Sequence, residues 1–252
     1  MIGLMAVNSH GLVLYWENIF MGVQSCVQLG LPFLNGEILQ VLKQISASCF
    51  LLATNLQIYK VDIRESYELE FVTLVKPKPL LSLLFSISQT AKDDTISILS
   101  FADSRHILVV SKVGVQKWAV SNNEDRFISE YNLKDLITKS VARDLSQDTS
   151  FSVLQVEIED AAFSRENLIC LCKVLLDKDQ IYFVLVHLKL DSEPHILDKQ
   201  QLSRCNPGLQ EARSRIGVVE GGSILFVFFQ NSIEIVSSIP GNSCLLKNRC
   251  CF

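Results

Sequence analysis

The chain has 252 residues, of which 48% are apolar and 20% are charged. This apolar content excludes an intrinsically disordered chain. Its 23 Lys and Arg residues are scattered and are outnumbered by 27 Asp and Glu residues, so direct, sequence-independent binding to nucleic acid is not expected. No uncharged stretch provides the roughly 20 consecutive apolar residues that a membrane-spanning helix needs.

Apolar residues recur in short runs that polar turns join in pairs. The second run of a pair often alternates with period two, as in Val115–Val120, and strands rather than helices produce that period. Five such pairs predict five hairpins. They are Gly3–Val7 with Leu12–Trp16, Cys49–Ala53 with Leu56–Val61, Ile107–Val110 with Val115–Val120, Leu168–Leu176 with Ile181–Leu190, and Ile224–Phe229 with Ile233–Val236.

Large aromatic residues close three of these hairpins, at Trp16, Tyr59 and Trp118. Their spacing is close to the roughly 40 to 50 residues per blade of propeller repeats. We therefore predict an all-β fold, a partial β-propeller of about five blades with short helical insertions. The propeller is expected over residues 1–240, with a divergent tail at 241–252. The alternative is a β-sandwich, which usually has shorter and more evenly spaced strands.

Two segments depart from the strand pattern and predict helices. Pro79–Ala91 places Ser82 and Ser86 on one side of a helical wheel, and Pro79 suits a first helical turn. Leu133–Leu145 has apolar residues at helical spacing after Asn132, a candidate N-cap. We interpret both as insertions between blades.

The first of these segments is the candidate membrane-binding site. Its polar side carries no charge, so it would bind by inserting its apolar side between loosely packed lipids, which favours a curved bilayer. A helix or strand buried in the core is an equally good interpretation of the pattern. The residues predicted to contact the membrane are Leu80, Leu81, Leu83, Leu84, Phe85 and Ile87.

Other residue types that could carry chemistry do not form a recognisable site. Cys170 and Cys172 would share one side of a strand, but a set of four zinc ligands is missing, so both are interpreted as core thiols. Gly221–Ser223 lacks the lysine of a phosphate-binding loop. Glu157, Glu159 and Asp160 are interpreted as part of a solvated strand face. We expect no catalytic, metal-binding or cofactor-binding residue, no cofactor and no small-molecule substrate.

Several short motifs, taken in their order, resemble the N-terminal β-propeller of the nucleoporin-133 family. They are Gly11–Trp16, Val109–Val120, Ser129–Leu133 and Cys205–Pro207. In that family, which belongs to the Y-shaped scaffold complex of the nuclear pore, a loop between blades carries a lipid-packing sensor helix. Leu80–Ala91 occupies the matching place.

The resemblance implies a structural nucleoporin without enzymatic activity. It would act in the nuclear pore complex of the nuclear envelope, in the nucleus, and support mRNA export and protein import. Its implied partners are nuclear pore scaffold proteins and a curved membrane surface. Compared with the family, the chain is expected to lack the first strands, the last blades and the helical stack. Two alternatives stay open: a WD-type interaction or adaptor propeller without a membrane role, and a propeller enzyme with carboxylates or histidines around its central channel.

Overall fold

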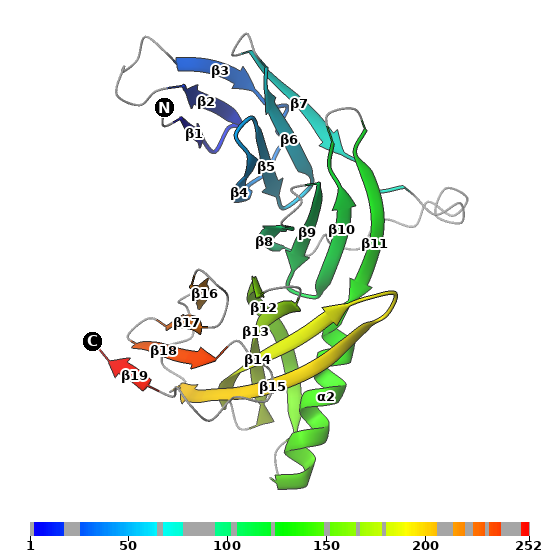
Figure 1. Cartoon of the computed structure of the whole chain (residues 1–252), viewed down its shortest axis with the longest axis vertical. Helices are drawn as coiled ribbons and strands as arrows, with labels where there is room; N and C mark the ends of the chain where they lie inside the picture. The colour runs from blue at the N-terminus through cyan, green and yellow to red at the C-terminus, as the bar shows by residue number, and fades with distance from the viewer. Residues whose placement is uncertain are drawn as a thin grey trace. The chain divides into compact units, whose positions relative to one another are not determined.

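The structure is a computed structural model of the chain. It describes residues 3–17, 26–64, 68–77, 94–101, 105–121, 124–148, 152–164, 167–177, 180–205, 214–219, 224–229, 232–237 and 248–251. These residues form strands β1 to β19 and the helix α2, and the strands make five antiparallel sheets (Figure 1).

The first two sheets follow the chain in order. The first contains β1 (Leu4–Val7), β2 (Leu12–Trp16) and β3 (Cys26–Gly30). The second contains β4 (Leu39–Ser46), β5 (Cys49–Thr54), β6 (Ile58–Ile63) and β7 (Leu69–Leu74).

The other three sheets also use consecutive strands. The third contains β8 (Thr95–Ser100), β9 (His106–Ser111), β10 (Gly114–Ala119) and β11 (Arg126–Asn132), and α2 (Leu133–Asp148) follows it. The fourth contains β12 (Val153–Ser164), β13 (Asn167–Leu176), β14 (Ile181–Leu190) and β15 (Pro194–Cys205). The fifth contains β16 (Arg215–Val218), β17 (Ile224–Phe229), β18 (Ser232–Ser237) and β19 (Asn248–Cys251).

The chain divides into two compact units. Unit 1 contains residues 1–108 and 117–128, and unit 2 contains residues 109–116 and 129–252. The third sheet contributes residues to both. Because β19 pairs with β18, residues 248–251 of the predicted tail belong to the fifth sheet. The predicted boundary at residue 240 stays a prediction.

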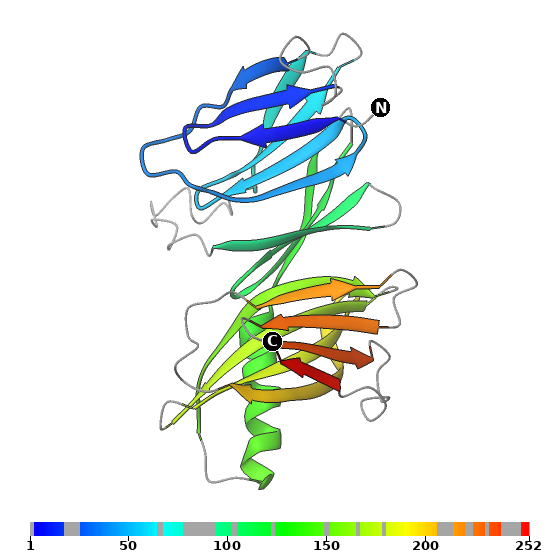
Figure 2. The same cartoon turned by 90° about the vertical axis from the view of Figure 1, so that its left-hand side faces the viewer.

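Within each unit, neighbouring sheets meet through strands that hold the same place in each sheet. In unit 1 β4 lies beside β8, and the last strands β3 and β7 also meet. In unit 2 β12 lies beside β16. Sheets of four sequential antiparallel strands that stack in this way are the blades of a β-propeller, as predicted. Figure 2 shows the fifth sheet, in orange and red, in front of the fourth sheet.

All five predicted hairpins are confirmed. The second arm of one begins later than predicted, at Ile58 instead of Leu56. The reason is a side-chain turn: the Thr54 hydroxyl accepts hydrogen bonds from the backbone N–H groups of Leu56 (3.1 Å) and Gln57 (3.0 Å). Such local bonds compete with strand pairing.

The helix predicted after Asn132 is also confirmed as α2. The Asn132 side chain accepts a hydrogen bond from the N–H of Asp135 (3.4 Å), as an N-cap does. Leu133, Ile137 and Val141 are buried along one side of the helix, which packs against β12. Among the described residues, no helix has both the length and the apolar content to cross a bilayer.

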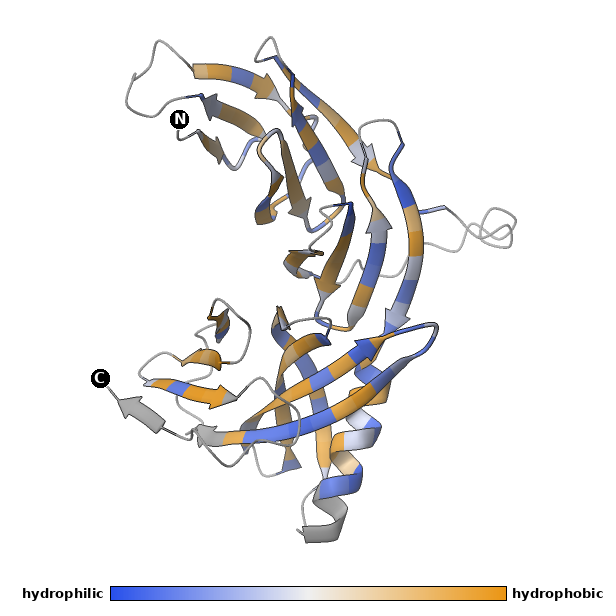
Figure 3. Cartoon of the chain, viewed as in Figure 1, coloured by the Kyte–Doolittle hydropathy of each residue, from blue (hydrophilic) through white to orange (hydrophobic). Residues whose placement is uncertain are grey.

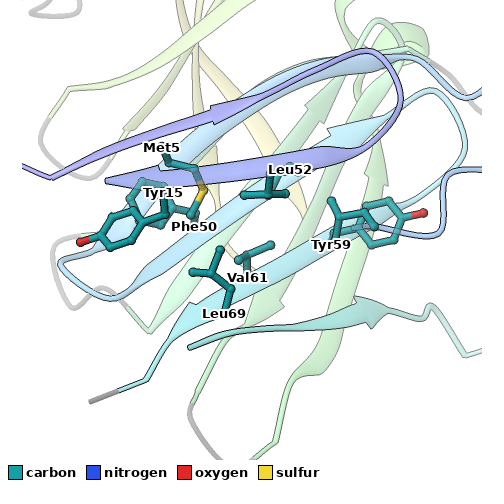
Figure 4. Close-up of a cluster of buried hydrophobic side chains, with 9 residues drawn as sticks. Met5, Tyr15, Phe50, Leu52, Tyr59, Val61 and Leu69 are labelled. Atoms are coloured by element: carbon teal, nitrogen blue, oxygen red, sulfur yellow. The ribbon is translucent and has the colours of Figure 1, made fainter. Parts of the chain in front are cut away.

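In the described part of the chain, a hydrophobic cluster in each unit holds neighbouring sheets together. In unit 1, Figure 4 shows Met5 and Tyr15 of the first sheet meeting Phe50, Leu52 and other side chains of the second. In unit 2, Leu185 and its neighbours on the fourth sheet pack against residues of the fifth. Phe183 and Phe229 meet there with ring centroids 5.1 Å apart.

Some central strands are buried along most of their length, and Figure 3 shows one of them, β5, mostly in the orange of hydrophobic residues. All six residues of β5 are buried, and β14 is buried from Ile181 to Leu188. Neighbouring sheets cover both faces of such a strand, so its sequence loses the alternation of a half-exposed strand.

Candidate functional site

The predicted membrane-binding residues lie outside the described residues. Leu80, Leu81, Leu83, Leu84, Phe85 and Ile87 all fall within residues 78–93. The structure describes the chain on both sides of this segment, in unit 1. β7 ends at Leu74 before it, and β8 begins at Thr95 after it.

Both attachment points lie at one end of the second sheet, which we call the loop end. Leu39 at the start of β4 pairs with Thr54, and Leu74 at the end of β7 pairs with Ile58. The start of β4, the turn between β5 and β6, and the end of β7 therefore lie together. Gln40 binds Asp94 and the N–H of Thr95 (2.7 and 2.8 Å), which holds the start of β8 beside β4.

The loop that joins β3 to β4, residues 31–38, covers part of this end. Leu31 is buried, and the Phe33 ring stacks on Tyr59 with centroids 5.6 Å apart. Gly11 has a φ of +79°, and a Cβ there would lie 2.8 Å from the Phe33 ring. Only glycine meets both conditions without strain, so this contact anchors the loop.

A buried carboxylate fixes the loop further. Glu37 is 5% exposed, and its oxygens accept hydrogen bonds from the Thr54 hydroxyl (2.6 Å), the Leu34 N–H (2.8 Å), the Gln57 amide (3.3 Å) and the Tyr59 hydroxyl (3.3 Å). Burial tends to raise the pKa of Glu37, but these bonds outweigh it and lower the pKa. Burial and the neighbouring Glu37 raise the pKa of Tyr59 to about 12. The network therefore contains a carboxylate and a neutral phenol at neutral pH.

Asn55 holds the end of the loop. Its side-chain oxygen accepts from the Ile38 N–H (2.8 Å), and its amide donates to the Gly36 carbonyl (3.1 Å). The Asn55 N–H also donates to the Ile38 carbonyl (3.1 Å). With its polar groups bound in this way, the loop presents Leu34 and Ile38 to solvent, 60% and 64% exposed.

A buried ion cluster joins the second sheet to the third within unit 1. The Lys60 ammonium lies 3.2 Å from both Asp62 and Asp125 and donates to the Ser121 carbonyl (2.5 Å). Burial opposes the charge of Lys60, but the two carboxylates outweigh it and raise the lysine pKa. Burial, followed by Asp62, raises the pKa of the Cys49 thiol to about 12. The cluster is a fixed contact between sheets, and the thiol is not activated.

The prediction that Asp160 lies on a solvated strand face is wrong. It is 6% exposed and accepts hydrogen bonds from the N–H groups of Ala161 (2.9 Å) and Ile216 (3.0 Å). Arg215 lies 3.8 Å away. Burial raises the pKa of Asp160, although the two hydrogen bonds and Arg215 act against this rise. The carboxylate joins β12 to β16, a contact between strands that sequence alternation cannot reveal.

His187 is another buried titratable group of unit 2. It lies on β14 at 1% exposure, between Ile169 and Asp198 in the register of the sheet. Neither ring nitrogen has a hydrogen-bond partner in the structure. Burial lowers the pKa of His187, and Asp198 opposes this only in part. The folded state therefore favours the neutral imidazole.

This environment predicts a loss of stability on acidification. The unfolded chain binds a proton at His187 near the ordinary pKa of 6.5, whereas the folded chain binds it only at lower pH. The free energy of unfolding should fall as the pH drops below that value. Urea unfolding at several pH values below 6.5 measures this change in the free energy of unfolding. His187→Gln should make the free energy of unfolding depend less on pH. The control His195→Gln, at an exposed position, should leave the pH dependence as in wild type. Equal slopes for wild type and His187→Gln would contradict the prediction.

The described residues contain no cluster of three or more His, Cys, Asp and Glu side chains that could hold a metal ion. Cys170 and Cys172 are free and fully buried, which confirms the prediction of core thiols. Burial raises the pKa of both. Such thiols are neutral and unreactive at neutral pH.

The sheet order and the stacking of first strands define a β-propeller protein. A sequence model of nucleoporins, described as Nup133 N-terminal like, matches residues 2–248. The chain belongs to this family. A search of curated proteins found no match.

Solved structures agree on the fold. The Nup133 β-propeller domain of Vanderwaltozyma polyspora is 17% identical with a TM-score of 0.70, and the match covers 99% of this chain and 72% of that one. A putative 6-phosphogluconolactonase of Bacteroides uniformis is 8% identical with a TM-score of 0.56, covering 98% and 70%. The periplasmic gluconolactonase PpgL of Pseudomonas aeruginosa is 12% identical with a TM-score of 0.56, covering 98% and 65%. At these identities the matches establish the propeller fold and no activity.

Proposed function

We propose that this chain is the propeller of a scaffold nucleoporin. It acts in the nuclear pore complex at the nuclear envelope, where it supports mRNA export and protein import together with other scaffold proteins. The observation that carries this proposal is the family match over residues 2–248, joined to a fold of stacked four-stranded sheets. The polar groups described above fit a structural role, because Glu37, Lys60 and Asp160 each bind groups that hold loops or sheets in place.

The cellular test is localisation of the endogenous protein. Tagged at its own locus, it should give a continuous rim at the nuclear envelope, and proximity labelling should enrich other pore scaffold proteins. A diffuse cytoplasmic signal without such enrichment would contradict the proposal. It would favour an adaptor propeller with other partners.

We also propose that the segment Leu80–Ile87 contacts the membrane. Its six large apolar residues and its uncharged polar residues suit insertion into loosely packed lipid. The segment leaves the loop end of the second sheet after Val75 and returns beside Gln40 at Asp94. Both attachment points therefore bring it to the same part of unit 1.

Vesicle flotation tests this contact. Small neutral phosphatidylcholine vesicles should retain the wild-type chain more strongly than large ones do, because curvature opens packing defects for apolar side chains. Leu84→Asp with Phe85→Asp should abolish retention, since charged groups do not enter the hydrocarbon. The matched control, Ser82→Asn with Ser86→Asn, changes only the polar side and should float like wild type. Equal recruitment by small and large vesicles would contradict curvature sensing.

A further inference from the structure

The fifth sheet has an apolar face that points away from the fourth sheet. On β17, Leu225 and Val227 are fully buried in the cluster between these two sheets. Successive side chains of a strand point to opposite faces, so Phe226 and Phe228 lie on the other face of the sheet. Phe228 is 41% exposed there, and Phe226 is half-buried. Large apolar side chains on this face are therefore open to solvent.

The strand register shows that these side chains share one surface. Phe226 pairs with Ile235 and Phe228 pairs with Ile233, and both isoleucines are half-buried. The two phenylalanine rings lie 6.3 Å apart. On the other side of β17, Phe226 pairs with Gly217, where a Cβ would lie 3.0 Å from the Phe228 ring. We call this surface the fifth-sheet face, and it consists of Phe226, Phe228, Ile233 and Ile235.

Among the described residues of the fifth sheet, the register places one charged residue on this face. Arg215 pairs with Phe228 and lies on β16, the edge strand of the sheet. Its guanidinium is 3.8 Å from the Asp160 carboxylate of β12. The charge therefore lies at the edge, close to an opposite charge of unit 2, and the centre of the face is apolar.

The first sheet has a similar face in unit 1. Met5 packs in the cluster with the second sheet, so alternation places Leu4 and Ala6 on the opposite face of β1. Leu4 pairs with Trp16 and Ala6 pairs with Leu14. Leu4 is 50% exposed, and the other three are half-buried. These four residues form the first-sheet face, and no charged residue of the described strands β1, β2 and β3 shares it.

These two faces are of the two kinds that meet inside the protein. The second sheet uses both of its faces, with Leu52 toward the first sheet and Lys60 toward the third. A junction therefore joins the face that one sheet turns toward its successor to the face that the next sheet turns toward its predecessor. The junction of the fourth and fifth sheets follows the same rule. The fifth-sheet face is of the first kind, and the first-sheet face is of the second kind.

We propose that the fifth-sheet face of one chain packs on the first-sheet face of a second copy. A second copy offers the apolar face that the stacking order requires, and the contact repeats a junction that the chain already makes within each unit. The match to the Nup133 β-propeller domain covers 72% of that chain, so a ring of that size needs more β-structure than one copy supplies. Because the two faces differ, the contact is head-to-tail, and it either closes into a ring or continues to longer assemblies.

Sedimentation equilibrium of the purified chain over a range of concentrations tests this contact. The average mass of the wild type should rise with concentration. Leu4→Asp and Phe228→Asp should each lower the association constant at least about tenfold, because each places an unpaired charge in an apolar contact. The control Leu197→Asp adds the same charge on β15, at a position 42% exposed, and should associate like wild type. Thermal unfolding checks that all three variants keep their fold.

Mixing the two variants tests whether the two faces bind each other. The Leu4→Asp chain keeps its fifth-sheet face, and the Phe228→Asp chain keeps its first-sheet face. Each variant alone should stay monomeric, and the mixture should form a dimer with one copy of each and nothing larger. A mixture that stays monomeric would overturn the proposal, as would loss of association in only one of the variants, which indicates a symmetric contact. A wild type that is monomeric at every concentration, or a Leu197→Asp chain that loses association equally, would also overturn it.

Discussion

Replacing Lys60 with methionine is expected to lower the free energy of unfolding by about 3 kcal/mol. Methionine keeps most of the packing of the lysine stem but removes the ammonium. The Asp125 carboxylate, whose side chain is 11% exposed, then loses its cation in a nearly buried place. A buried charge without a partner lowers the stability of the folded state. Asp62 also loses its cation, but its side chain is 34% exposed, so water solvates it and it contributes less to the destabilisation. Equilibrium urea unfolding measures the change.

Two controls test whether the loss of stability comes from the buried charge that Lys60→Met leaves unpaired. Adding Asp125→Asn to Lys60→Met should recover part of the loss, because it removes the charge that the first change leaves unpaired. Arg64→Ala breaks the exposed ion pair with Glu70 and should change stability by less than about 0.5 kcal/mol. If Lys60→Met and Arg64→Ala have equal effects, the buried cluster does not stabilise unit 1 as described.

Gly114→Ala is expected to destabilise the protein by about 3 kcal/mol, the upper range for overpacking. A Cβ at this position would overlap the backbone carbonyl of Tyr131 and lie 3.3 Å from the Asn132 Cα. These are main-chain atoms at the start of α2, so no side-chain rotation relieves the overlap. The N–H groups of Leu133 and Lys134 donate to the Val113 carbonyl (3.0 and 2.8 Å), so a shift there would also strain the first turn of the helix.

Gly30→Ala is the matched control for this change. Gly30 is exposed on β3, and a Cβ there has no atom within 4 Å. Its stability in urea should equal wild type or slightly exceed it, because alanine reduces the freedom of the unfolded chain. A Gly114→Ala protein as stable as Gly30→Ala would show that β10 and the start of α2 can separate at no cost.

The sequence predicts the local elements of this fold well. Period-two alternation and polar turns identified the five hairpins, and an asparagine before a helical pattern identified the cap of α2. Each of these signals lies within about 20 residues of chain. Because the blade pattern also repeats along the chain, the hairpins together predict the propeller.

The polar clusters could not be predicted in the same way. Lys60 and Asp125 are 65 residues apart, and Asp160 and Ile216 are 56 residues apart. Stacking of sheets brings each pair together, and no local pattern records which residues will meet. Asp160 therefore resembled the neighbouring solvated carboxylates.

Every described sheet consists of strands that are consecutive in the chain, and this has a consequence for how the protein forms. Each hairpin needs only a short loop to close, so a sheet can assemble soon after its residues leave the ribosome. The slower step is the docking of one finished sheet on the next through clusters such as that around Tyr15 and Phe50. Synthesis from the N-terminus would then add the sheets one at a time. Each sheet would expose an apolar face until the next sheet in the chain packs against it.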